Sequence, residues 1–284
     1  MKVDCSMLIA KLNKAMNFPN WEKIVPFLAI MVLVASNPPA GTKKIYKKEI
    51  NTIVIDAGHG GHDPGCMNAG VKEKEVTLAL ALALGSKIKE QMPDVKIIYT
   101  RSSDKFVELW ERSAIANKNN ADLFISLHCN STKNPSVHGT ETFAMGLHKA
   151  EDNLEVAKRE NSVLLLEEAY QQRYDGFDPN TPESHIYFTL FQNAYMDHSI
   201  RLAAKVENQI SKGINRPSRG VKQAGFVVLW KSGMPSILVE SGFISNKGDR
   251  EYLNSEKGVD EMATAMSTAI YEYKKSFEAT AAAR

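Results

Sequence analysis

The chain has 284 residues, of which 43% are hydrophobic and 24% charged, as in a soluble globular protein with a sizeable core. The formal net charge is +2, and residues 41–284 are neutral because the first forty residues hold four Lys and two acids. This balance argues against nucleic acid or an anionic membrane surface as a partner. Three cysteines without a CxxC pair argue against a disulfide scaffold and a thiolate zinc site, although Cys66 and Cys129 could pair.

An unbroken apolar run covers residues 24–35 and follows Lys23. The run is shorter than the roughly 18 to 20 residues of a membrane-spanning helix, and small residues follow it. This order is typical of a secretory signal, so we expect residues 1–40 to be a signal peptide or N-terminal anchor and residues 41–50 a linker. A buried N-terminal helix is the alternative. The prediction is an exported protein of the periplasm or cell envelope, in contact with the membrane only if the leader is uncleaved.

Strand-like and helix-like segments alternate along residues 51–276. The predicted strands are 52–56, 95–100, 123–127, 140–145, 226–230 and 236–240. The predicted helices are 74–91, 107–119, 150–171, 185–212 and 256–274. This alternation predicts a single α/β domain with a mostly parallel or mixed sheet and helices on both faces. Residues 277–284 are expected to form a C-terminal tail.

Three predicted strands end at side chains that can bind a metal or move a proton. His59 lies in the glycine-rich turn that ends the first strand, His128 follows the third, and Glu240 ends the last. In open α/β sheets the active site lies outside the carboxyl ends of the strands, so we expect these side chains to meet. A catalytic zinc site typically takes three ligands from His, Glu or Asp and leaves a fourth position to water. The pattern therefore indicates a candidate zinc site.

A carboxylate must complete such a set, and Glu73 and Glu75 both open the helix that follows the glycine-rich turn. They stand about 200° apart on a helix of 3.6 residues per turn, so one of them faces the metal. Glu240 then remains as a general base and acid. His62 is an equally plausible ligand by spacing. A hydrogen-bonded structural histidine is the alternative interpretation of each lone His.

Two aspartates near the glycine-rich turn have two interpretations. Asp56 and Asp63 either orient a histidine ring or form turns. The glycines at 58, 60 and 61 do not follow the order of a phosphate-binding loop, which disfavours nucleotide binding.

Five segments carry a specific family pattern: IVIDAGHGGHDPG, KEKEVTLALA, TRSSDKFVELWERSAIAN, ADLFISLHCNS and PSILVESGFISN. In this order, across roughly residues 50–275, they resemble the zinc-dependent, cell-separating N-acetylmuramoyl-L-alanine amidases. The resemblance implies a twisted six-stranded sheet and one Zn²⁺ per chain. It implies His59, Glu73 and His128 as the ligands and Glu240 as the catalytic acid/base. Cys129 stands where many members have alanine, and strand alternation predicts that it packs on the opposite face.

The reaction implied by the resemblance is hydrolysis of the amide bond between N-acetylmuramic acid and L-alanine of the peptidoglycan stem peptide. The implied context is cell-wall remodelling and daughter-cell separation. One alternative is a catalytically inert wall-binding module. A second is a zinc peptidase that cuts within the stem peptide, since its site would look the same.

Residues 146–197 separate two sheet segments by far more than the usual ~2–6-residue connection. A charged helix with Glu155, Glu160, Glu167 and Glu168 is predicted there, followed by a Gly- and Pro-rich loop. One interpretation is a solvated helix and an exposed loop. The resemblance instead implies an inserted helical segment that occludes the zinc cleft until a protein activator binds it. We expect Glu167 or Glu168 to take the open zinc position, because carboxylate oxygen is a good zinc ligand.

Overall fold

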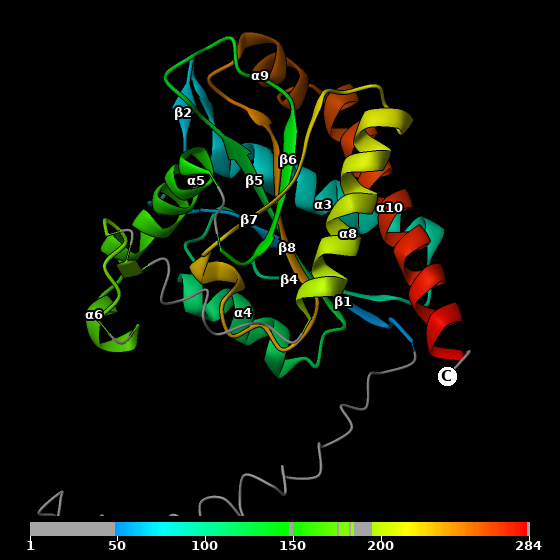
Figure 1. Ribbon diagram of the computed structural model, residues 1–284. Helices are drawn as coiled ribbons and strands as arrows, with labels where there is room; N and C mark the ends of the chain where they lie inside the picture. The colour runs from blue at the N-terminus through cyan, green and yellow to red at the C-terminus, as the bar shows by residue number, and fades with distance from the viewer. Residues whose placement is uncertain (1–48, 148–149, 175, 182, 185–194, 283–284) are drawn as a thin grey trace, which may run out of the picture. The chain divides into compact units, whose positions relative to one another are not determined.

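The computed structural model describes residues 49–147, 150–174, 176–181, 183–184 and 195–282 (Figure 1). The predicted leader, residues 1–40, and most of the linker lie outside the described residues. Within the described ranges, no helix combines the length and apolar character that crossing a membrane requires.

A six-stranded mixed sheet forms the centre of the fold, as the resemblance implied. Its strand order is β4-β1-β5-β8-β6-β7 (Figure 1). The strands β4, β1, β5 and β8 are parallel, β6 runs antiparallel to β8, and β7 is parallel to β6. Their bounds are β1 Thr52–Ala57, β4 Lys96–Tyr99, β5 Leu123–Asn130, β6 Thr140–Met145, β7 Ser218–Ala224 and β8 Ser236–Phe243. A small hairpin, β2 Met67–Asn68 with β3 Val71–Lys72, stands apart from this sheet.

Helices cover both faces of the sheet, which confirms the predicted α/β architecture. One apolar core joins the sheet to α3 (Glu73–Gln91), α8 (Met196–Asn208) and α10 (Glu256–Ala282), seen at the right in Figure 1. A second core joins the other face to α4 (Leu109–Lys118) and the short 3-10 helix η3 (Val227–Leu229). In α3 the apolar residues recur every four positions and are buried, as the helical period requires: Val76, Leu80, Leu84 and Ile88.

The inserted segment lies on the same face as α4. Helix α5 (Glu151–Asn161) leads into the 3-10 helix η1 (Ser162–Leu166) and the short helix α6 (Tyr170–Arg173). The predicted continuous helix over 150–171 is therefore wrong beyond Asn161. Of the predicted helix over 185–212, residues 185–194 lie outside the described residues. The described part is α8, which a π-helical turn, η2 (Gln209–Gly213), extends.

Two further expectations about elements are wrong. The apolar segment 226–230 forms η3 rather than a strand, because the second core buries it on every side and its apolar run carries no period. The sixth strand of the sheet is instead the edge strand β7, whose polar sequence suits an exposed sheet edge. The predicted C-terminal tail at 277–284 is helical as far as Ala282, because α10 continues through it. Helix α9 (Lys247–Leu253) was not predicted.

Candidate metal centre

The turn after β1 brings two histidines together. His59 has a left-handed backbone, with φ 60°, and its ring centroid lies 4.9 Å from that of His128 on β5. A Cβ atom at Gly58 would lie 2.6 Å from the His128 ring. Glycine is therefore required at position 58 for β1 and its turn to pass this close to the His128 side chain.

Two buried arginines hold the backbone of this turn. Arg112 on α4 donates to the carbonyl of His59 (2.9 Å) and to that of Ala57 (2.7 Å). Arg101 donates to the carbonyl of Gly58 (2.7 Å) and also to that of Ala57 (2.9 Å). Both side chains are about 1% exposed. The three carbonyls of the turn are thus satisfied by guanidinium groups, which fix the unusual backbone conformation of His59.

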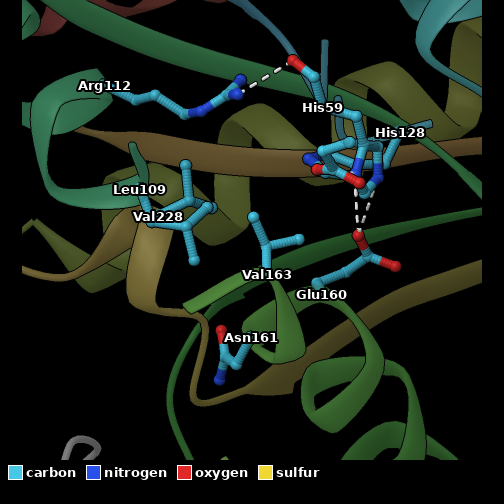
Figure 2. Close-up of a pocket in the computed structure, with 9 residues that line it drawn as sticks. His59, Leu109, Arg112, His128, Glu160, Asn161, Val163 and Val228 are labelled. Atoms are coloured by element: carbon cyan, nitrogen blue, oxygen red, sulfur yellow. Dashed lines mark hydrogen bonds and ion pairs between the residues drawn. The ribbon is translucent and has the colours of Figure 1, made fainter. Parts of the chain in front are cut away.

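Four side chains converge at the carboxyl ends of β1 and β5. His59, Glu73, His128 and Glu160 each offer one ligand atom, and these atoms lie within 4.8 Å of one another. Glu73 Oε1 is 3.1 Å from His59 Nε2 and 3.2 Å from His128 Nδ1. Glu160 Oε2, on α5 of the insert, is 2.9 Å from His128 Nδ1 and 3.3 Å from His59 Nε2 (Figure 2). All four are buried.

Neighbouring groups orient two of these side chains. Asp63 Oδ2 lies 2.7 Å from His59 Nδ1, which leaves Nε2 to face the cluster. This contact confirms the interpretation of Asp63 as a partner of a histidine ring. The carboxylate of Glu73 accepts from the backbone N–H groups of Cys66 and Cys129, both at 2.8 Å. Glu73 therefore opens α3 with its side chain fixed between the glycine-rich turn and β5.

The donor set fits a bound metal ion. Among the described residues, His59 Nε2, His128 Nδ1 and Glu160 Oε2 are buried and make no aligned hydrogen bond, although they lie close together. Buried polar atoms without partners are rare in folded proteins. Two imidazole nitrogens and two carboxylate oxygens pointing at one position form a common coordination set for Zn²⁺. A metal ion at this position would satisfy all four.

The charges of the four side chains also favour a bound metal ion. Burial alone would raise the pKa of Glu73, but the facing His59 lowers this pKa to about 2. Burial alone would lower the pKa of His128, but the Glu160 carboxylate raises it to about 9. Each carboxylate is thus stabilised by positive charge at the centre of the cluster. A divalent cation would supply that charge in place of protons.

Glu240 lies beside the cluster rather than in it. On β8 it stands directly opposite His128 of β5, fully buried, and it is not one of the four converging donors. Its Oε1 is 3.4 Å from Arg159 Nη2. Burial, and then the charge of Glu160, raise the pKa of Glu240 well above its usual range. A raised pKa suits a carboxyl group that accepts and donates protons near neutral pH.

The sequence-based alternatives separate clearly in the structure. Glu75 has 56% of its side chain exposed on the outer side of α3, so Glu73 is the acid that faces the cluster. His62 is exposed and packs on Phe106. Asp56 does not orient a histidine, since its partners are Thr100, Ser126 and Arg112.

The roles of His59, Glu73, His128 and Glu240 in binding and catalysis stay predictions. Cys66 and Cys129 are free thiols, and Cys129 packs in the first core as expected.

The insert supplies an acid to the cluster, but the residue was predicted wrongly. Glu167 instead accepts from the backbone N–H of Leu109 (2.6 Å) and from the Tyr174 hydroxyl (2.8 Å), and Glu168 is exposed. Glu160 takes the position facing the histidines. Its signal in the sequence is its spacing from Val156, four residues earlier, which places it on the buried face of α5.

Little free space remains beside the cluster. The adjoining cavity has a volume of ≈ 10 Å³, about the space of a single water molecule. Glu160, Asn161 and Val163 of the insert form one wall, and Leu109, Arg112 and Val228 line the opposite side (Figure 2). A molecule larger than water does not fit beside the cluster while α5 and η1 occupy this position.

Comparison with known proteins places this geometry in a family. Residues 53–272 match the family Amidase_3, N-acetylmuramoyl-L-alanine amidase. The chain is 32% identical to N-acetylmuramoyl-L-alanine amidase AmiA of Escherichia coli over 80% of this chain and 77% of AmiA. It is 33% identical to the uncharacterized protein YqiI of Bacillus subtilis over 79% of this chain and 85% of YqiI. An N-acetylmuramoyl-L-alanine amidase structure from Clostridium difficile 630 superposes with a TM-score of 0.60 and 26% identity, covering 80% and 98% of the two chains.

Proposed function

The chain belongs to the N-acetylmuramoyl-L-alanine amidase family, whose members hydrolyse an amide bond of peptidoglycan, and from that premise we propose a specific reaction. The protein hydrolyses the bond between the lactyl group of N-acetylmuramic acid and the L-alanine of the stem peptide. The observation that carries this proposal is the convergence of His59, Glu73 and His128 beside Glu240. The context that we propose is cell-wall remodelling and daughter-cell separation.

One Zn²⁺ per chain is the proposed cofactor, held by His59, Glu73 and His128. When bound, such an ion supplies a water of lowered pKa and polarises the scissile carbonyl. Asp63 orients His59 for this task, and the N–H groups of Cys66 and Cys129 orient Glu73. Outer groups of this kind fix ligand geometry and raise metal affinity.

Glu240 is the proposed acid/base. Its carboxylate takes a proton from the attacking water and returns one to the alanine nitrogen as the amide bond breaks. Its position opposite His128, outside the converging donors, supports this role over that of a ligand. Its burial favours the protonated form that the second step requires.

The test of the reaction is a digest of purified peptidoglycan, analysed by mass spectrometry with and without a metal chelator. We expect free stem peptides and intact glycan strands, with the products absent when the chelator is present. Shortened stems on intact glycan would show that the protein is a peptidase instead of an amidase. If a folded, metal-loaded protein with an open cleft gave no product, the protein would instead be a wall-binding module.

The insert, residues 146–197, is proposed to restrain the enzyme. Glu160 lies where the open coordination position of a three-ligand site would be, and Arg159 on the same helix contacts Glu240. A protein activator that draws α5 away would open both positions at once. A short Gly/Ser linker in place of the insert is expected to raise activity on purified peptidoglycan without a partner. Unchanged activity of such a folded, zinc-loaded variant would overturn this restraint.

Export is proposed from the sequence alone, since the leader lies outside the described residues. A fusion of residues 1–50 to a reporter is expected to reach the cell envelope, because the apolar run over 24–35 has the length and flanks of a signal. Retention of the reporter in the cytoplasm would contradict this prediction.

A further inference from the structure

A row of polar side chains continues from the candidate site across the sheet. His128 on β5 stands opposite Glu240 on β8, and Glu240 stands opposite Glu141 on β6. Side chains directly opposite one another on neighbouring strands share one face of the sheet. The next strand, β7, carries Arg219 and Lys222 beside Glu141. Two cations therefore flank the proposed acid/base on the side of the sheet away from His59.

Glu141 holds these two cations in place. Its carboxylate is only 2% exposed and accepts from Asn130, from Arg219 Nε (3.2 Å) and from Lys222 Nζ. Aromatic rings support both side chains, Phe243 under the Arg219 guanidinium and Phe143 near the Lys222 ammonium. Two cations share one carboxylate, so the cluster keeps one net positive charge.

The cations are also reachable. The side chain of Arg219 is 36% exposed and that of Lys222 is 19% exposed. A guanidinium has five N–H donors, and among the described residues the ionic partner of Arg219 is Glu141, through Nε. The terminal N–H groups of Arg219 can therefore bind a second, incoming carboxylate while Glu141 contacts Nε.

The distance suits the peptide part of the proposed substrate. Neighbouring strands are about 4.8 Å apart, so β7 lies about 10 Å from β8. An extended peptide covers roughly 3.3 to 3.6 Å per residue, so 10 Å corresponds to about three residues beyond the scissile amide. Helix α5 of the insert packs against β7. The segment that carries Glu160 therefore lies along this path as well.

We propose that Arg219 and Lys222, positioned by Glu141, form a subsite that binds a free carboxylate of the stem peptide. The subsite selects acidic over amidated stems and places the chain across β8 so that its first amide bond reaches Glu240. This inference rests on the proposed amidase function and adds that the enzyme recognises a free carboxylate of the stem peptide.

The test compares two N-acetylmuramoyl tripeptides, one with its carboxylates free and one with them converted to carboxamides. The full chain carrying Glu160→Ala and one Zn²⁺ per chain is assayed on both. We expect kcat/KM for the free acid to be roughly tenfold to a hundredfold higher, as for a hydrogen bond between charged groups. Cleavage of both at equal kcat/KM would overturn the subsite alone. Cleavage of neither substrate, by Glu160→Ala and by the variant with a Gly/Ser linker in place of the insert alike, would overturn the proposed reaction as well.

Variants of the two cations locate the effect. In the same background, Arg219→Gln and Lys222→Met should each raise KM for the free acid and reduce the preference, whereas Arg219→Lys should keep part of it. Lys231→Met is the matched control, since the Lys231 ammonium lies over Trp230 and outside this cluster. Melting temperatures verify that each variant is folded. A full preference retained by folded Arg219→Gln and Lys222→Met would overturn the assignment.

Discussion

The glycine-rich turn at 57–63 and helix α5 both bring a donor to the candidate metal centre, but the protein holds them in different ways. The turn follows a central strand, and buried Arg101 and Arg112 satisfy its carbonyls. Helix α5 packs on the sheet with one face, while Glu155 on the other face has 62% of its side chain exposed. The donor of the turn is part of the core, and the donor of α5 is carried by a segment laid over it.

This difference separates permanent from removable parts of a site. Moving His59 away would leave several buried hydrogen-bonding groups without partners, each at a cost of about 1–3 kcal/mol. Moving α5 exposes a few apolar side chains and breaks polar contacts at its C-terminal end, such as those of Asn161 with the backbone of Gly225 and Val227. If the proposed function is right, the zinc ligands belong to the permanent part of the site, and Glu160, which blocks it, belongs to the removable part.

The largest effect is expected from breaking the permanent set. His128→Ala should lose both zinc and activity, with turnover falling by roughly a thousandfold or more, because metal assistance contributes several kcal/mol. Metal content measured on the purified protein, together with the peptidoglycan digest, checks this outcome. His138→Ala, at an exposed histidine, is the control and should change neither quantity. Full metal occupancy in His128→Ala would remove His128 from the ligand set.

Glu240→Gln should separate catalysis from metal binding. Glu240 lies outside the four converging donors, so the variant should keep its zinc. Turnover should fall by about 10²–10⁴-fold, the usual contribution of general acid–base catalysis. Metal analysis and initial rates on the same sample provide the measurement. Loss of zinc together with activity would show that Glu240 is a ligand and that the assigned roles are wrong.

Much of the permanent region could be predicted from sequence. The strands near the site are apolar runs, and the residues at their ends include His59, His128 and Glu240. The helical period at 73–91 left two acids, of which Glu73 proved to be buried and Glu75 exposed. Local pattern succeeds here because burial, spacing and strand ends all point to the same residues.

The removable region could not be predicted to the same depth. The spacing of Glu160 from Val156 is a local signal that it lies on the buried face of α5, but its contact with the two histidines depends on where α5 meets the sheet. That docking is a tertiary contact, and no local preference records it. The same limit explains β7 and η3, since the polar edge strand lacks an apolar run and the apolar segment 226–230 is buried without being a strand.

Glu160→Ala should release the restraint. Removing the carboxylate that faces His59 and His128 breaks the contact that holds α5 over the cluster. Helix α5 should then move away more often, and basal activity should rise by about tenfold to a hundredfold, the value of a charge-assisted contact. Glu155→Ala is the matched control, an acid on the exposed face of the same helix. Rates on purified peptidoglycan without a partner give the measurement. A variant that keeps its zinc and gains no activity would count against occlusion by Glu160.

The smallest effect concerns the second attachment of the insert. Glu167 accepts from the first N–H group of α4, and Tyr174 accepts from the next one, Trp110, so the insert caps the helix that carries Arg112. Loss of such a cap usually costs about 1 kcal/mol. Glu167→Ala should therefore lower the free energy of unfolding by about this amount and raise basal activity a few-fold. Glu168→Ala, at the exposed neighbour, should do neither.

The pH dependence of this attachment sharpens the prediction. Burial raises the pKa of Glu167 above its ordinary value of 4.5, so the native protein binds a proton more tightly here than the unfolded chain does. The free energy of unfolding contributed by this group therefore decreases as pH rises from about 4.5 through the native pKa. Glu167→Gln cannot titrate and should lose this component. Denaturant unfolding of wild type and Glu167→Gln across that range measures the difference between them. The difference should favour wild type increasingly as pH falls, and a pH-independent difference would show that Glu167 is not held in a proton-favouring environment.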